Sequence, residues 1–435
     1  MAHLKGHIGY PIIGDKSVEF YKDPIEFVNK RVNEFDEKIF QSRVLNTPTV
    51  FIASAEGVRQ LLYEKSHNFE MGYRAFMYNL YGDNLLFSGH DEAHRIRSVL
   101  HHLFSGESVQ QWDSLLEKLM NRNFDRLDSG CALPMYKVFK RFCTELSISI
   151  FLDVDIESSL ELVQETTDLA TTHWHGIISV PFSLKVPYWS SGFKKAIEAK
   201  NSLFEIICKR LVQTVDGDFL QQIKSAGFKD MTEAAHHVLL FISALVPKAM
   251  ASLLTSFTIL MAEKDYITHC EKACRDEQYL QYVLLEVQRL WPPFLGGRRL
   301  ASQDCEIGGF KIPKGYAAAY ITYSAQRDPK IFPDPDEFRP ERWRTCNAGN
   351  ENYLSCFGGG PRDCVGSSLM NRMLKTVCKY LLNHYSWLVP NGQDLTHKWL
   401  PVSRPKQQVM VVYELKSDLE QSSEFTEVDD PDIHS

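Results

Sequence analysis

The sequence lacks several features that would assign it to large protein classes. Among its 435 residues, 48 lysines and arginines stand against 55 aspartates and glutamates, so it lacks the basic excess typical of nucleic-acid-binding proteins. It has no uninterrupted run of about 18 apolar residues, the length that a membrane-spanning helix needs. It also shows no secretory signal at the N-terminus. We therefore expect no nucleic acid partner, no transmembrane anchor in this chain, and a location in the cytoplasm or peripheral to an intracellular membrane.

Closely spaced cysteine pairs are absent as well. The ten cysteines are scattered, and none forms the paired motifs typical of zinc sites. Cys270 and Cys274 lie four residues apart in a predicted helix, without partner ligands. This usage favours reduced thiols in a reducing compartment.

Basic residues are missing from the C-terminal segment. Residues 417–435 carry seven acidic side chains and no lysine or arginine. The rest of the chain is then neutral, with 48 basic and 48 acidic residues. We predict that residues 416–435 form an acidic, disordered tail.

One stretch stands out against this background, a glycine-rich loop with a cysteine near its end, Cys356–Gly366. The glycines allow positive φ angles and a close approach of the backbone to a flat ligand. Backbone N–H groups near Cys364, together with the positive end of the helix that follows, would stabilise a thiolate. A thiolate in such a loop is a good axial ligand for haem iron. The alternative is a free buried cysteine, and the loop pattern favours the ligand.

The loop carries a specific resemblance. Phe357, Gly360, Cys364 and Gly366 fit the pattern F-x-x-G-x-x-x-C-x-G. In this the loop resembles the haem-binding loop of the cytochrome P450 superfamily. The resemblance implies haem b as cofactor, with Cys364 as its thiolate ligand and metal-binding residue.

The resemblance extends over nearly the whole chain, from Gly9 to about Leu415. It implies a single cytochrome P450 domain, residues 1–415, with a mainly α fold and a small β subdomain. The β-rich edge is expected near residues 40–55 and 300–325. The segment from Phe40 to Ala53 indicates two strands around a turn.

Further haem contacts follow from the same resemblance. His94 and Arg97 match the helix positions that send side chains to a haem propionate; the alternative is a solvated, basic helix start. Phe357, Arg362 and Arg299 are the other side chains that we expect to bind the cofactor.

A helix motif and a later arginine complete the family pattern. Glu286 and Arg289 are three residues apart, share a helix face and can pair. In the resembling family they form a buried network with the arginine that Arg342 matches. A buried charge cluster is stable only if every member is paired. We therefore interpret Glu286, Arg289 and Arg342 as a structural network.

The helix expected over the distal face of the haem departs from the family pattern. Oxygen-activating members carry an acid and a threonine there, which move protons to bound oxygen. In register, this sequence has Leu245, Val246 and Pro247, none of which donates a side-chain proton. Pro247 has no N–H to give to the carbonyl of Ser243, so we predict a kink. Ser243, Leu245, Val246 and Pro247 are the predicted catalytic, haem-facing residues.

The missing acid–alcohol pair leaves several reactions open. The fatty-acid peroxygenase branch has Arg-Pro at these positions, but Val246 stands where its arginine should be, and Lys248 is on another helix face. Branches that rearrange hydroperoxides bring their own O–O bond, which an apolar distal wall suits. A conventional NADPH/O2-dependent monooxygenase of a lipophilic small molecule is the alternative, with Ser243 or Ser252 as partial substitutes. A haem-thiolate binder or sensor without turnover is a further class.

The sequence favours a haem-thiolate oxidoreductase of lipid metabolism. The expected substrate is hydrophobic, a fatty acid or lipid peroxide, and the expected oxidant is a peroxide or the pre-oxygenated substrate itself. The sequence identifies no redox partner.

Overall fold

A computed structural model describes residues 3–125, 127, 130–179, 192–263, 267–344 and 351–416. Except for Lys416, the predicted acidic tail of residues 416–435 lies outside this range. Of the ten cysteines, nine lie in the described part of the chain, and all nine are free thiols.

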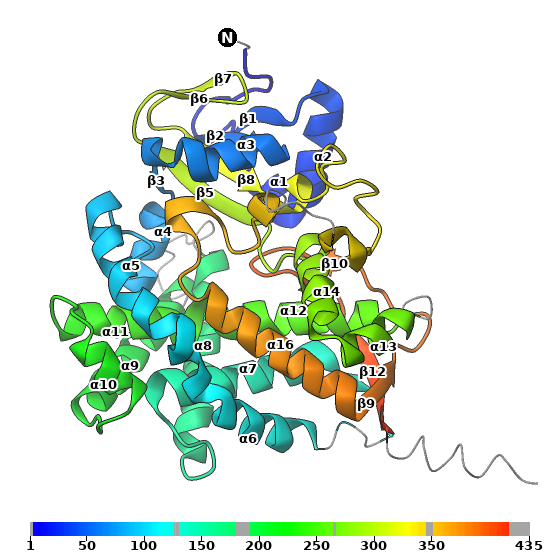
Figure 1. The fold of residues 1–435 in the computed structure, drawn as a ribbon. Helices are drawn as coiled ribbons and strands as arrows, with labels where there is room; N and C mark the ends of the chain where they lie inside the picture. Colours follow the sequence, from blue (N-terminus) through cyan, green and yellow to red (C-terminus); the bar gives the residue numbers. More distant parts are fainter. Residues whose placement is uncertain are drawn as a thin grey trace, which may run out of the picture.

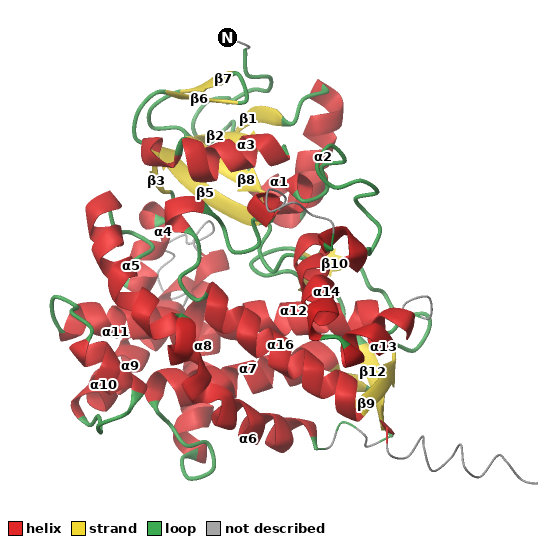
Figure 2. Ribbon diagram, viewed as in Figure 1, coloured by secondary structure: helices red, strands yellow, loops and turns green. Residues whose placement is uncertain are grey.

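The molecule has a sheet-containing part and a larger helical part, which Figures 1 and 2 show at the top and the bottom of the view. The helices are α1 (Ser17–Lys22), α2 (Pro24–Phe35), α3 (Ala55–Arg59), α4 (Arg74–Tyr81), α5 (His90–Phe104), α6 (Asp113–Phe124), α7 (Met135–Leu152), α8 (Leu160–Ser179), α9 (Gly192–Val212), α10 (Phe219–Ser225), α11 (Met231–Leu240), α12 (Val246–Met261), α13 (Ile267–Arg275), α14 (Glu277–Leu290), α15 (Thr322–Ala325) and α16 (Ser367–His384). Two π-helical turns are η1 (Gln60–Glu64) and η5 (Phe241–Leu245).

Short strands complete the fold. They are β1 (Ile39–Val44), β2 (Thr47–Ile52), β3 (Phe69–Met71), β4 (Leu133–Pro134), β5 (Gly296–Ala301), β6 (Cys305–Ile307), β7 (Phe310–Ile312), β8 (Ala317–Ile321), β9 (Tyr385–Leu388), β10 (His397–Lys398), β11 (Arg404–Pro405) and β12 (Met410–Leu415). The main sheet has five strands in the order β1-β2-β8-β5-β3. Only the β2–β8 pair within it is parallel.

The sequence explains the main hairpin. Strands β1 and β2 pair antiparallel, with Val44 opposite Thr47. Between them, Leu45 and Asn46 both take positive φ angles, 54° and 53°, the left-handed conformation that suits the twist of a two-residue hairpin. The mainly α fold with a small β subdomain is thus as the sequence predicts.

The longest helical run is formed by α11, η5 and α12, and it is the one helix among the described residues that is long and apolar enough to cross a bilayer. Its apolar window is wholly buried inside the protein. The sequence shows no uninterrupted apolar run here, because the polar residues His237, Ser243 and Lys248 interrupt the apolar stretch. Its burial makes it the core helix of the helical part.

Candidate active site

The cysteine loop is fixed by its own backbone and by η1. The N–H of Cys364 donates to the carbonyl of Phe357 at 2.9 Å, which closes the loop on itself. Gly360 has a φ of 65°, and a Cβ there would stand 2.0 Å from the carbonyl oxygen of Leu62. A Cβ on Gly359 would likewise stand 2.7 Å from the hydroxyl of Tyr63. The glycines therefore let the loop press against η1, and this contact sets where the cysteine emerges.

Cys364 and Cys356 differ in access although both belong to this loop. Cys364 is exposed and Cys356 is buried. Cys364 is nevertheless surrounded by protein atoms densely enough that desolvation raises the pKa of its thiol, while the Gly366 N–H and the charge of Arg97 lower it. Burial raises the pKa of Cys356 far above its usual range. An accessible sulfur that receives an N–H is suited to metal ligation, and Cys364 has this geometry.

Arg97 is tied directly to the cysteine loop. From α5 its guanidinium donates to the backbone carbonyl of Asp363 at 2.7 Å, and it also pairs with the Asp363 carboxylate. His94, on the preceding turn of the helix, is exposed to solvent. Arg95 points elsewhere and pairs with Glu92 and Glu233. The helix therefore turns Arg97 toward the loop and Arg95 away from it.

Two further arginines face the same region. Arg362 donates from Nη2 to the carbonyl of Ser88 at 2.8 Å, while its Nη1 is buried without a hydrogen-bond partner. Burial, followed by the positive charges of Arg299 and Arg97, lowers the pKa of Arg362. Arg299 is itself buried and lies 5.6 Å from the ring centroid of Tyr320. Three guanidiniums thus share one region with an unsatisfied buried donor.

These groups fit haem. A haem contains an iron, which binds a thiolate, and it carries two propionate carboxylates at its edge, which bind cations. Cys364 is the accessible sulfur, and Arg299 and Arg362 are cations that the propionates would neutralise. Arg97, which pairs with Asp363, adds a third guanidinium to the same region. Assignment of Phe357 and His94 to the cofactor stays a prediction, since no contact of either side chain marks it.

The glutamate of α14 sits at the centre of a buried ion cluster. Both Glu286 and Arg289 are fully buried, and the Arg289 guanidinium donates to both carboxylate oxygens at 3.0 and 2.8 Å. The Nε of Arg342 donates to the same carboxylate at 2.9 Å. The backbone N–H of Arg339 and the indole of Trp343 add bonds of 3.0 and 2.9 Å. The three predicted residues therefore lie together, and Trp343 is a member that the sequence reasoning missed.

Arg289 of this cluster also binds backbone carbonyl groups. Its remaining N–H groups donate to three carbonyls, those of Gln326, Pro335 and Glu337. A buried charge with every donor satisfied stabilises the segments that it bridges. This cluster joins α14 to the chain that precedes the cysteine loop.

The distal helix departs from regular α geometry near its proline. The turn Phe241–Leu245 is π-helical and ends two residues before Pro247. The carbonyl of Ser243, four residues before Pro247, accepts a bond of 2.8 Å from Nζ of Lys248. A lysine side chain thus satisfies the carbonyl that proline cannot reach. The side chains of Leu245 and Val246 lie outside the described residues.

The hydroxyl of Ser243 forms a hydrogen bond with His173 of α8. It lies 2.9 Å from Nδ1 of His173, whose Nε2 lies 2.7 Å from the carbonyl of Leu80. A carbonyl only accepts, so Nε2 carries the proton. Burial lowers the pKa of His173 to about 4, so the ring is neutral and Nδ1 accepts from Ser243. The proton of Ser243 is therefore directed to His173.

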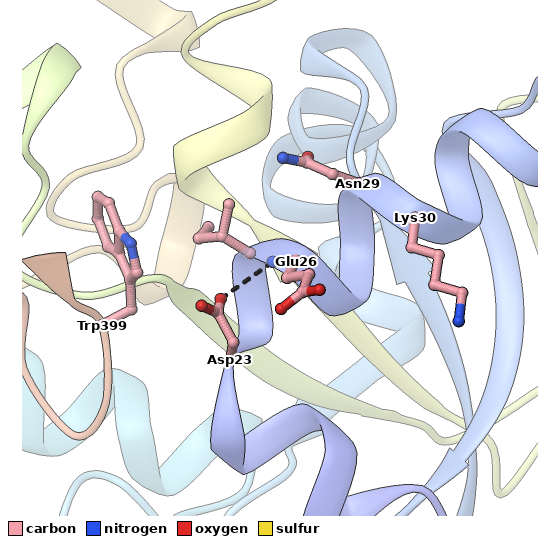
Figure 3. A pocket seen from close by; sticks show the side chains of 6 residues that line it. Asp23, Glu26, Asn29, Lys30 and Trp399 are labelled. Atoms are coloured by element: carbon pink, nitrogen blue, oxygen red, sulfur yellow. Dashed lines mark hydrogen bonds between the residues drawn. The ribbon is translucent and has the colours of Figure 1, made fainter. Parts of the chain in front are cut away.

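A surface pocket beside α2 is separate from this site. It is lined by Asp23, Ile25, Glu26, Asn29, Lys30 and Trp399 (Figure 3). The dashed bond in the figure is the N-cap of α2, in which the Asp23 carboxylate accepts from the Glu26 N–H at 3.0 Å. Its lining includes no residue of the cysteine loop or the distal helix, so it takes no part in the candidate site.

Comparisons with known proteins point to one family. The cytochrome P450 family model matches residues 9–238 and 226–412. The beta-amyrin 28-monooxygenase of Vitis vinifera is 23% identical over 91% of this chain and 91% of its own length.

Two solved structures share the fold. The retinoic acid-bound cyanobacterial CYP120A1 aligns with a TM-score of 0.83 and 23% identity, over 95% of this chain and 99% of its own. Cytochrome P450EX alpha (CYP152N1) with myristic acid aligns with a TM-score of 0.76 and 18% identity, over 95% of this chain and 100% of its own. With a glycine-rich cysteine loop, an arginine cluster and a family match over most of its length, the chain belongs to the cytochrome P450 family.

Proposed function

We propose that the protein oxidises a lipid-like carboxylic acid, and that it takes its oxygen from a peroxide or from a pre-oxygenated substrate. Haem bound through Cys364 would supply the cleavage of the O–O bond and the oxidation of the substrate. The protein's own residues then have three tasks, which are to hold the thiolate, to neutralise the propionates and to shape the distal wall.

The observation that carries the proposal is the state of the distal helix. Leu245, Val246 and Pro247 offer no side-chain proton, and the hydroxyl of Ser243, four residues before Pro247, donates to His173. An enzyme that uses O2 needs side chains that can bring protons to the site, and such donors are what this helix lacks. A peroxide already contains a reduced O–O bond, so its use requires fewer protons from the distal helix. A helix without proton donors therefore suits a peroxide better than O2.

The substrate class rests on two structural neighbours. CYP120A1 holds retinoic acid and CYP152N1 holds myristic acid, and both ligands are apolar chains that end in a carboxylate. The apolar window of the distal helix is wholly buried inside the protein, which suits such a chain. We infer an amphiphilic acid as substrate.

A conventional monooxygenase is the second candidate. It is supported by the similarity to the Vitis vinifera 28-monooxygenase and would require an external reductase. A binder or sensor without turnover is the third.

One experiment separates the three. The purified holoenzyme is incubated with a fatty acid plus H2O2, with a fatty-acid hydroperoxide alone, or with a fatty acid, NADPH and a reductase, and products are identified by mass spectrometry. We expect products in a peroxide arm. Products only with NADPH would replace the proposal by the monooxygenase, and products in no arm would indicate a binder.

A further inference from the structure

A buried lysine lies on the distal helix without an acidic partner. Lys248 is 4% exposed, and its Nζ donates to the Ser243 carbonyl at 2.8 Å and lies 5.2 Å from the ring centroid of Trp174. No carboxylate of the described residues pairs with it. Burying an ammonium without a counter-charge is unfavourable. Accordingly, burial, followed by the charge of Lys140, lowers the pKa of Lys248 to about 7.

Two more cations lie on elements that pack against the helix of this lysine. Lys140 projects from α7 and Arg404 from β11, and both elements pack against α12. Burial and then the charge of Arg404 lower the pKa of Lys140. The same three charges act together on His175 of α8. Cations from three elements thus act on His175 of a fourth, and among the described residues no acid neutralises Lys140 or Lys248.

Two buried hydroxyls that are close to Arg404 and Lys248 in the chain also lack hydrogen-bond partners. Ser403 precedes Arg404 in the chain, is fully buried, and its Oγ has no hydrogen-bond partner. Ser252, one turn after Lys248 on the same helix face, is 1% exposed and equally unpartnered. Buried hydroxyls are normally satisfied. Unsatisfied donors next to uncompensated cations indicate a site that an anion completes.

We propose that Lys140, Lys248 and Arg404 form a carboxylate site that holds the acid end of the lipid substrate, with the Ser403 and Ser252 hydroxyls as additional donors. This deepens the proposed function, on which it rests for the identity of the ligand. A carboxylate there would restore the charged form of Lys248 and accept from several donors at once. It would also fix one end of the substrate beside the π-helical turn of the distal helix.

The test is a spectral titration of the holoenzyme, which requires no turnover. Palmitic acid, methyl palmitate and acetate are each added, and binding is followed through the haem Soret band. We expect palmitic acid to bind at least about tenfold more tightly than the ester, since each charge-assisted bond contributes roughly this factor. Equal affinity of acid and ester would overturn the site. Acetate competing as strongly as palmitate would overturn the lipid ligand.

Variants assign the effect to residues. Lys140→Met and Arg404→Gln should each weaken palmitate binding by about tenfold and leave the ester unchanged. Lys137→Met, an exposed lysine on the same helix, is the matched control and should change neither. An unchanged acid-to-ester ratio in both cluster variants would overturn the assignment. Lys248→Met also loses the bond to Ser243, so it is interpreted only if haem content is retained.

The result is independent of the oxidant. Discrimination of acid from ester without turnover in any arm would keep the carboxylate site and reject the proposed reaction. If the ester binds as tightly as the acid and is oxidised at the same rate, the proposed oxidation is supported and the carboxylate site is rejected.

Discussion

The Nζ of Lys248 lies 2.8 Å from the backbone carbonyl oxygen of Ser243, to which it donates a hydrogen bond. Pro247 lacks the N–H that would reach this carbonyl in a regular helix. The lysine therefore stabilises a turn that the proline disturbs, and it does so as a buried cation. One contact links the irregular distal helix to the cationic cluster.

The pH dependence of stability should report this burial. The pKa of Lys248 is about 7 in the folded protein and about 10.4 in an unfolded chain. Below pH 7 both states are protonated, and the folded state bears the full cost of the buried ammonium. Between pH 7 and 10 the unfolded state binds more protons, so wild-type stability rises with pH relative to Lys248→Met.

The size of this effect is measurable. The free energy of unfolding of Lys248→Met minus that of the wild type should fall by up to roughly 4 kcal/mol between pH 7 and 10. Denaturant titrations across this range give the two curves. Parallel curves would show that Lys248 has an ordinary pKa and is solvated.

The buried ion cluster should be essential for folding. Arg289→Ala removes one of the two guanidinium partners of the buried Glu286 carboxylate, and removing one partner of a buried ion cluster costs roughly 3–5 kcal/mol. We expect a haem-poor, unstable protein, measured by haem content and thermal unfolding. Arg339→Ala is the control because that side chain is half-exposed and pairs only with surface acids. Its stability should change by less than about 1 kcal/mol. A stable holo Arg289→Ala would contradict the structural role.

The iron ligand is tested by cysteine replacement. Cys364→Ala should abolish the red-shifted Soret band of the reduced carbonyl complex, because that band requires the thiolate. Cys356→Ala should retain it, since this buried thiol takes no part in ligation. The reverse outcome would place the ligand at Cys356.

The loop glycine provides a test of geometry alone. Gly360→Ala combines a φ of 65° with a Cβ placed 2.0 Å from the Leu62 carbonyl, so the loop must move away from η1. Gly309→Ala shares the positive φ, 84°, but meets no atom within 4 Å. Haem retention should fall in the first variant and stay near wild type in the second. Equal retention would show that the contact with η1 does not position Cys364.

The features predictable from the sequence are those that depend on local spacing. The cysteine loop follows from glycines around Cys364, and the Glu286–Arg289 pair follows from one helical turn. The disturbed carbonyl of Ser243 follows from a proline four residues later. Each of these needs only a short stretch of chain.

Features that depend on packing were not predictable. The sequence indicated that Lys248 was on another face of the helix, but not that it was buried against Trp174 or that Lys140 and Arg404 approach it. The commitment of Ser243 to His173 likewise requires that α8 cross the distal helix at one point. Such contacts join segments that are far apart in the chain, and no spacing rule indicates them.

The most direct test of the account is the coupling of NADPH oxidation to product formation in the unmodified protein. With a competent reductase and a fatty acid, we predict that most electrons leave as H2O2, while H2O2 or a lipid hydroperoxide supplied directly drives rapid product formation. Leu245→Glu with Val246→Thr, which restores an acid and an alcohol, should raise the coupled fraction. Rapid, tightly coupled NADPH-dependent oxidation by the wild type would contradict the claim that this distal helix lacks a proton supply.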